Sequence, residues 1–188
     1  MNVYDFDQTV FYPDSSFCFV KYCLRHYPRA VLPSLPDVLA AGCRKCLNQA
    51  EMRELKEKIF SFLPRLDNID RIVLDFWSEH RGNLASWYLD QLRPDDLILS
   101  ASPEFLLRPI AEELGVRLIA TRMDPHTGRI IGNNCHDAEK VCRFLKEYPN
   151  EKIDAFYSDS LSDSPMAWFA EEAWLVKNGT ELVPWPNK

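Results

Sequence analysis

Two carboxylates lie close together near the start of the chain. Asp5 and Asp7 are separated by one residue and follow a short apolar run that begins at Asn2. Two like charges at the end of a buried strand are costly unless a cation lies between them or one carboxyl keeps its proton. Hard cations such as Mg²⁺ prefer oxygen ligands of this kind. The pair therefore predicts a site for a hard metal ion, and the alternative is a solvated turn.

A second polar group reads Ser-Ala-Ser-Pro-Glu over residues 100–104 and follows the apolar run 96–100. Ser102 is expected to be the N-cap of a helix over 103–114, with Pro103 at its first position. Main-chain N–H groups at the start of a helix attract anions. Ser100 and Ala101 are therefore predicted to bind a phosphoryl oxygen.

Three further charged residues complete the candidate site. Lys140 lies near the start of a helix expected over 137–148, and Asp159 and Asp163 follow the apolar run 153–158. A lone helical lysine is usually solvated, but an ammonium group can neutralise both a phosphate and a carboxylate. Acidic residues at the carboxyl ends of strands lie where open α/β sheets bind ligands.

The elements that must position these residues follow from hydrophobic patterning. Short apolar runs predict strands over 2–6, 96–100, 116–121, 153–158 and 173–177, and helical patterns are expected over 103–114, 137–148 and 164–172. Alternation of strands and helices predicts a Rossmann-like α/β fold, a parallel sheet with helices on both faces. Residues 122–132 predict a short hairpin around His126 to Gly128.

The stretch from 13 to 91 differs because its apolar residues recur at helical spacing. We expect an all-helical insertion there, which we call the cap segment. The predicted domains are a catalytic core made of residues 1–12 and 92–188 and a cap domain made of residues 13–91.

In this order, the polar groups resemble the four signature motifs of the haloacid dehalogenase superfamily. The D-x-D-x-T-V start, S-A-S-P-E, the N-C-H-x-x-E-K approach to the lysine and D-S-x-x-D-x-P-M look most like the phosphoserine phosphatase-like branch. Two positions depart from that branch: Ser158 and Ala138 stand where glycine is common.

The resemblance implies a Mg²⁺-dependent phosphatase that works through an aspartyl-phosphate. Asp5 would be the nucleophile and Asp7 the acid and base. The remaining implied roles are phosphate binding by Ser100, Ala101 and Lys140, metal binding by Asp5, Asp159 and the carbonyl of Asp7, and support of the metal waters or of Lys140 by Asp163. Dehalogenases of the superfamily lack an acid at the Asp7 position, so a retained Asp7 favours phosphoester hydrolysis.

Several substrate and function classes remain open. Small phosphomonoesters such as phosphoserine or a sugar or glycerol phosphate are the first expectation, and a lipid head-group phosphate such as phosphatidylglycerophosphate is the second. Basic residues outnumber acidic ones between 13 and 50, which suits an anionic substrate, a membrane surface or an ordinary solvated helix face. A phosphotransferase shares the same residues, and a non-catalytic phosphate-binding module has no use for Asp7.

Composition limits the remaining possibilities. The chain has 188 residues and a net charge of −6, which gives no support for a nucleic-acid surface. The apolar stretches are too short or too interrupted for a transmembrane helix. The six cysteines, including the C-x-x-C pair Cys43 and Cys46, are expected to be free thiols in a cytoplasmic protein.

Overall fold

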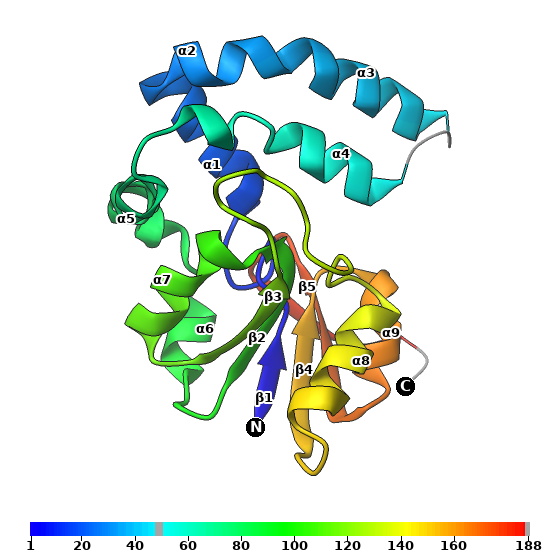
Figure 1. Ribbon diagram of the computed structural model, residues 1–188. Coiled ribbons are helices and arrows are strands. Elements are labelled where there is room, and N and C mark those ends of the chain that lie inside the picture. The colour runs from blue at the N-terminus through cyan, green and yellow to red at the C-terminus, as the bar shows by residue number, and fades with distance from the viewer. Residues whose placement is uncertain (48–50, 187–188) are drawn as a thin grey trace.

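The computed structural model describes residues 1–47 and 51–186 (Figure 1). The strands are β1 (Asn2–Tyr4), β2 (Leu97–Pro103), β3 (Arg117–Thr121), β4 (Ile153–Ser158), β5 (Ala170–Lys177) and β6 (Glu181–Pro184). The α-helices are α1 (Ser15–His26), α2 (Pro28–Val31), α3 (Leu35–Cys46), α4 (Met52–Ile59), α5 (Ile69–His80), α6 (Ser86–Gln91), α7 (Glu104–Leu114), α8 (Ala138–Glu147) and α9 (Ser164–Ala167). Single 3₁₀ turns are η1 (Leu32–Ser34), η2 (Leu63–Arg65), η3 (Arg81–Asn83) and η4 (Leu161–Asp163).

The described residues form one sheet of six strands in the order β3-β2-β1-β4-β5-β6. The first five strands run parallel, and β6 pairs antiparallel with β5. The chain reverses its winding at β1, so the carboxyl end of β1 lies at the switch point where open α/β sheets bind ligands. The predicted α/β fold with a mostly parallel sheet is confirmed.

Successive residues of a strand point to opposite faces of the sheet, and their side chains pack in two hydrophobic clusters, one on each face. On β1, Val3 packs in the cluster that includes Phe144 of α8, whereas Tyr4 packs in the cluster that includes Leu107 of α7. Figure 1 shows α6 and α7 on one side of the sheet and α8 and α9 on the other. Both faces are therefore covered, as the apolar strand sequences require.

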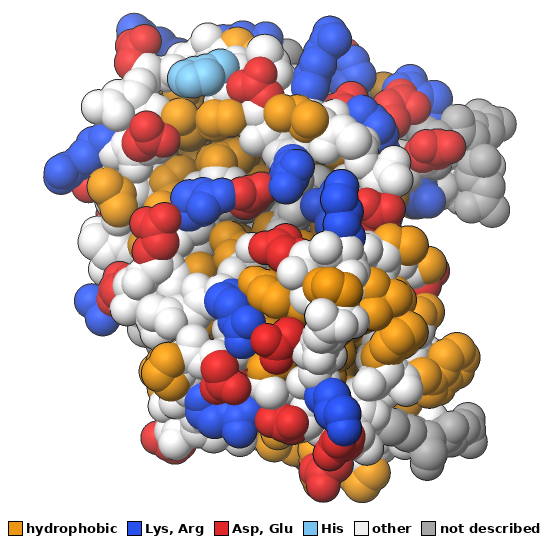
Figure 2. All heavy atoms as spheres, turned by 60° about the horizontal axis from the view of Figure 1, so that its bottom comes forward, with side chains coloured by type: hydrophobic (Ala, Val, Ile, Leu, Met, Phe, Trp, Pro, Cys, Tyr) orange, Lys and Arg blue, Asp and Glu red, His pale blue; other side chains and the backbone are white. Residues whose placement is uncertain are grey.

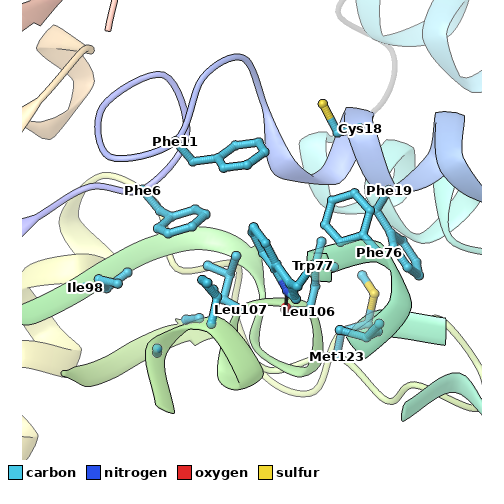
Figure 3. Packing of buried hydrophobic residues seen from close by; sticks show 14 of the residues in the cluster. Phe6, Phe11, Cys18, Phe19, Phe76, Trp77, Ile98, Leu106, Leu107 and Met123 are labelled. Carbon is cyan, nitrogen blue, oxygen red and sulfur yellow. Dashed lines mark hydrogen bonds between the residues drawn. The ribbon is translucent and has the colours of Figure 1, made fainter. Parts of the chain in front are cut away.

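The cap segment is helical from α1 to α6, and it lies partly above the carboxyl ends of the strands (Figure 1). Asp14 begins α1 as its N-cap, since its side chain accepts a hydrogen bond from the N–H of Phe17. In Figure 3, Trp77 of α5 lies between Phe6 and Leu106, and its indole N–H donates to the carbonyl of Leu106 at 2.7 Å. One hydrophobic cluster thus joins the cap helices to the sheet and α7.

Two predictions near the C-terminus need correction. The helix expected over 164–172 ends at Ala167, and β5 begins at Ala170 instead of at residue 173. Trp168 and Phe169 are 65% and 51% exposed, so the helical apolar pattern that included Phe169 does not face a core. Strand β6 has no counterpart among the predicted strands, because a short edge strand with partly exposed side chains lacks a strong apolar run.

The predicted hairpin around residues 126–128 is confirmed in outline. The N–H of Asp124 donates to the carbonyl of Arg129 at 2.9 Å, and Met123 and Ile130 form an antiparallel bridge. Gly128 adopts a φ of +70°, a conformation that favours glycine. The hairpin rises from the sheet toward α4 (Figure 1).

Two further observations concern surface charge and the length of the helices. Figure 2 shows acidic and basic side chains interspersed over the face that includes the amino-terminal ends of the strands, in keeping with the mild net charge. Within residues 1–47 and 51–186, no helix has the length and apolar character needed to span a membrane.

Candidate active site

The seven residues singled out in the sequence meet in one pocket at the carboxyl end of the sheet. The pocket has a volume of about 800 Å³. Its lining includes Asp5, Asp7, Ser100, Ala101, Lys140, Asp159 and Asp163. Four segments that are far apart in the chain therefore contribute to one site, and the switch point of the sheet explains why they converge.

The loop after β1 is fixed by main-chain hydrogen bonds. The N–H of Asp5 donates to the carbonyl of Tyr157 at 2.8 Å, so the first motif is attached to the end of β4. The hydroxyl of Thr9, fully buried, accepts from the N–H of Asp159 at 3.0 Å. These bonds attach the loop after β1 to the end of β4, next to Asp159.

Lys140 lies between two buried carboxylates. Its Nζ donates to Oδ1 of Asp5 at 2.7 Å and to Oδ2 of Asp163 at 2.6 Å. Burial alone lowers the pKa of Lys140, but the two carboxylates outweigh this effect and raise the pKa above its ordinary value. The ammonium group therefore stays charged and orients Asp5. The hydroxyl of Ser158 also donates to Oδ2 of Asp163 at 2.8 Å, so the serine that replaces the usual glycine contributes a hydrogen bond.

Asp7 occupies a separate hydrogen-bonded position. Its Oδ1 accepts from the N–H of Ser15 at 2.6 Å, and its Oδ2 accepts from the hydroxyl of Ser102 at 2.5 Å. Burial and the nearby carboxylate of Asp14 raise the pKa of Asp7 to about 7, against the opposing effect of these donors. A carboxyl with this pKa suits proton transfer near neutral pH.

Ser102 was expected to be a helix cap, and that expectation is wrong. Pro103 is the N-cap of α7, and no side chain caps the helix. The register of β2 against β3 shifts between Ser100 and Pro103, which places an irregularity at Ala101 and Ser102. Such irregularities re-aim side chains at the ends of strands. Ser102 contacts Asp7 as a result, and Ser100 accepts from the N–H of Ser102 at 3.0 Å.

The carboxylates around Asp5 fit a divalent cation. Burial, and to a lesser extent the nearby charges of Asp5 and Asp163, raise the pKa of Asp159 to about 6. Oδ1 of Asp163 is buried and has no hydrogen-bond partner. Among the described residues, no three acidic, histidine or cysteine side chains form a ready-made metal cluster. The implied ligands are the side chains of Asp5 and Asp159 and the main-chain carbonyl of Asp7. This set contains only two acidic side chains, so it does not need a cluster of three.

Three residues on one face of α4 attach the cap segment to the core, and we call these contacts the α4 latch. Arg53 donates to the carbonyls of Ile130 at 2.8 Å and Gly132 at 2.7 Å. Glu57 accepts from the N–H of Ile130 at 3.0 Å. Lys56 Nζ donates to the carbonyl of Ala101 at 2.6 Å and also to Oδ1 of Asn134 at 2.8 Å.

Lys56 is a residue of the site that sequence reasoning missed. Its ammonium group lies in the pocket, next to the Ser-Ala-Ser segment. Burial lowers the pKa of Lys56 to about 8, although the carboxylates of Asp7 and Asp14 act in the opposite direction. The sequence gives no sign of this position, because lysines are common on exposed helix faces and only the docking of α4 turns this one inward.

Known proteins resemble this chain over most of its length. The family model for haloacid dehalogenase-like hydrolases matches residues 3–167. The chain is 30% identical to Protein CicA of Caulobacter vibrioides, over 90% of this chain and 82% of that protein.

Solved structures share the fold. A protein of unknown function from Bordetella pertussis Tohama I has a TM-score of 0.76 and 21% identity, covering 92% of this chain and 87% of that one. A probable phosphoserine phosphatase from Vibrio cholerae has a TM-score of 0.67 and 14% identity, covering 91% of this chain and 54% of that one. Because the family model covers most of the sequence, this chain belongs to the haloacid dehalogenase-like hydrolases.

Proposed function

We propose that this protein is a Mg²⁺-dependent phosphatase that hydrolyses a phosphomonoester through an aspartyl-phosphate on Asp5. The observation that carries the proposal is the meeting of all seven candidate residues in one pocket below the cap segment. Family membership supports hydrolysis. A solved phosphoserine phosphatase described as a phospho-aspartyl intermediate analogue, with a TM-score of 0.52 and 14% identity, supports the choice of intermediate.

In the first step, a carboxylate oxygen of Asp5 attacks phosphorus and the bond from phosphorus to the leaving alcohol breaks. Lys140 already donates to Oδ1 of Asp5, so the other oxygen is the one left to react. Donors for the phosphoryl oxygens are the Ser100 hydroxyl, the Ala101 N–H and the Lys140 ammonium. Splitting hydrolysis into two displacements lowers each barrier.

Asp7 moves the protons of both steps. It protonates the leaving alcohol in the first step and accepts a proton from the attacking water in the second, which releases phosphate and restores Asp5. Ser102 and the N–H of Ser15 hold the Asp7 carboxyl in one orientation. This second carboxyl distinguishes a phosphatase from a module that only binds phosphate.

A Mg²⁺ ion would be held by Asp5, Asp159 and the carbonyl of Asp7, with Asp163 available to support its waters. When bound, it supplies positive charge that lets an anionic nucleophile approach an anionic substrate. The raised pKa of Asp159 and the unpartnered Oδ1 of Asp163 support this assignment.

The test is phosphate release from a panel of phosphomonoesters with Mg²⁺ or with EDTA. We expect metal-dependent release by the wild type and loss of at least about 1,000-fold in Asp5→Asn and 100-fold in Asp7→Asn. Asp90→Asn is the matched control, because Asp90 is an exposed aspartate on α6 outside the pocket. Its rate should equal that of the wild type.

Equal turnover in Asp5→Asn would exclude this residue as the nucleophile. No release from any panel member, together with measurable Mg²⁺ binding, would favour a phosphate-binding module. Added acceptor alcohols distinguish hydrolysis from phosphoryl transfer, since a transferase would form a new phosphoester in place of free phosphate.

We also place this reaction in the cytoplasm. All six cysteines are free thiols, including Cys43 and Cys46. Free thiols are usual in reducing compartments.

A further inference from the structure

The part of the pocket that faces away from Asp5 is lined by apolar side chains of the cap segment. They come from α1, α2, α3 and α4. Six of them are Phe17, Val20, Val31, Leu35, Val38 and Met52. Phe17 is 64% exposed and Met52 46% exposed, so both have apolar surface that no protein group covers.

The cap's polar side chains in the pocket are already engaged within the protein. Asp14 accepts from the N–H of Phe17 at 2.7 Å, and the hydroxyl of Ser16 is 2.9 Å from that of Ser102. The hydroxyl of Ser34 accepts from Arg65 at 2.8 Å. Lys56 donates to two acceptors of the core, as described above. On the cap side of the pocket, the hydroxyl groups of a sugar or glycerol would therefore compete with these internal contacts for hydrogen bonds.

From this lining we infer that the leaving alcohol of the substrate is apolar, a phosphomonoester of an aliphatic or aromatic alcohol. The inference rests on the proposed phosphatase function and specifies its substrate class. The same cavity contains Asp5 and the apolar lining, so a phosphate bound at Asp5 projects its alcohol toward α1 and α3. Hydroxyl groups that lose water without gaining partners oppose binding, whereas buried methylene groups favour it.

The volume agrees with this class. At about 800 Å³ the cavity lies in the upper part of the range that takes drug-sized ligands. A serine or glycerol moiety would leave apolar lining in contact with water. A larger aliphatic chain or an aromatic ring would cover more of this lining.

The experiment measures kcat/KM for ethyl, butyl, hexyl and octyl phosphate, below their aggregation concentrations, with Mg²⁺. We expect an increase of about two- to fourfold for each added methylene until the chain leaves the cavity. Phosphoserine and glycerol 3-phosphate should rank near ethyl phosphate. Naphthyl phosphate shows whether a ring is accepted as well as a chain.

Two neighbouring positions on α3 provide matched variants. Val38 lines the cavity, whereas Leu39 is 70% exposed and lies outside it. Val38→Asn should lower kcat/KM for octyl phosphate at least fivefold and leave ethyl phosphate within twofold. Leu39→Asn should leave both within twofold, because it changes the same helix without touching the cavity.

The outcomes separate the two proposals. Hydrolysis with no chain-length dependence, or with phosphoserine or glycerol 3-phosphate as the best substrate, overturns the apolar leaving group and leaves the phosphatase in place. Equal effects of Val38→Asn and Leu39→Asn on octyl phosphate also overturn it. No release from any compound overturns the phosphatase itself.

Discussion

Removal of the ammonium group of Lys140 tests the electrostatic structure of the site without any substrate. In Lys140→Met, the buried carboxylates of Asp5 and Asp163 lose the cation that lies 2.7 and 2.6 Å from them. The side chains of Lys140 and Asp163 are 2% and 3% exposed, so water screens the remaining charges poorly. Removing one partner of a buried ion pair costs about 3–5 kcal/mol.

The assay is urea unfolding followed by tryptophan fluorescence, in EDTA so that no metal compensates. With a slope of about 2 kcal/mol per molar urea, the expected loss lowers the midpoint by about 1.5–2.5 M. The control is Lys146→Met, which removes an exposed lysine from the same helix and should change stability by less than about 0.5 kcal/mol.

A second variant isolates the charge repulsion from other effects of the methionine. The double variant Lys140→Met, Asp163→Asn removes one of the two carboxylates that no longer have a cation beside them. It should recover at least about 1 kcal/mol of the lost free energy of unfolding. A midpoint for Lys140→Met within about 0.3 M of the wild type, or a double variant that is no more stable than the single one, would refute the reasoning.

Three further predictions concern the contacts around the pocket. Ser102→Ala removes the hydroxyl group that donates to Asp7 and should lower kcat about 10- to 100-fold. A decrease of less than threefold would contradict the role of Ser102 in positioning Asp7. Binding of a phosphonate inhibitor checks that the variant is folded. For Lys56, burial lowers the pKa from 10.5 to about 8, so between these values the unfolded chain holds the additional proton and stability rises with pH. Urea unfolding at pH 7.5 and 9.5 should therefore show that the stability of the wild type, relative to that of Lys56→Met, increases with pH. A relative stability that falls with pH would contradict the burial of the charge. Gly128→Ala should lower stability by more than about 1 kcal/mol, because φ is +70° and the added methyl would meet the carbonyl of Phe60. Gly132 also has a positive φ, +79°, but open space around it, so Gly132→Ala measures only the cost of the backbone conformation. Both variants are compared by thermal unfolding, and equal losses of stability would exclude the clash at Gly128.

The candidate residues were predictable because each follows an apolar run that could only be a buried strand or begins a well-marked helix. Asp5 and Asp159 directly follow β1 and β4, and Ser100 lies within β2; the carboxyl ends of parallel strands meet at one edge of a sheet. Their convergence needs no knowledge of side-chain contacts. The hydrophobic pattern of the sequence is therefore sufficient to predict that these three residues lie close together.

The rest depends on contacts between distant segments. Ser102 has the sequence of a helix cap, and only the irregular pairing of β2 with β3 directs its hydroxyl to Asp7. The sequence around Lys56 resembles that of any amphipathic helix, and only the packing of α4 against the core brings its ammonium group to the carbonyl of Ala101. Strand β6 gains its identity from pairing with β5, not from its own apolar content. Tertiary context overrides local pattern at each of these places.

The α4 latch has a consequence for how this protein can diverge. Arg53 and Glu57 bind main-chain groups of Ile130 and Gly132, and Lys56 binds the carbonyl of Ala101. Main-chain carbonyls and N–H groups persist through most substitutions, so mutations on the hairpin leave the attachment of the cap intact. Within the limits set by the packing of Ile130, the positive φ of Gly132 and the close contact of Gly128 with Phe60, the sequence of the hairpin can change. A descendant lineage can thus alter the sequence of the hairpin while the cap keeps its position on the core.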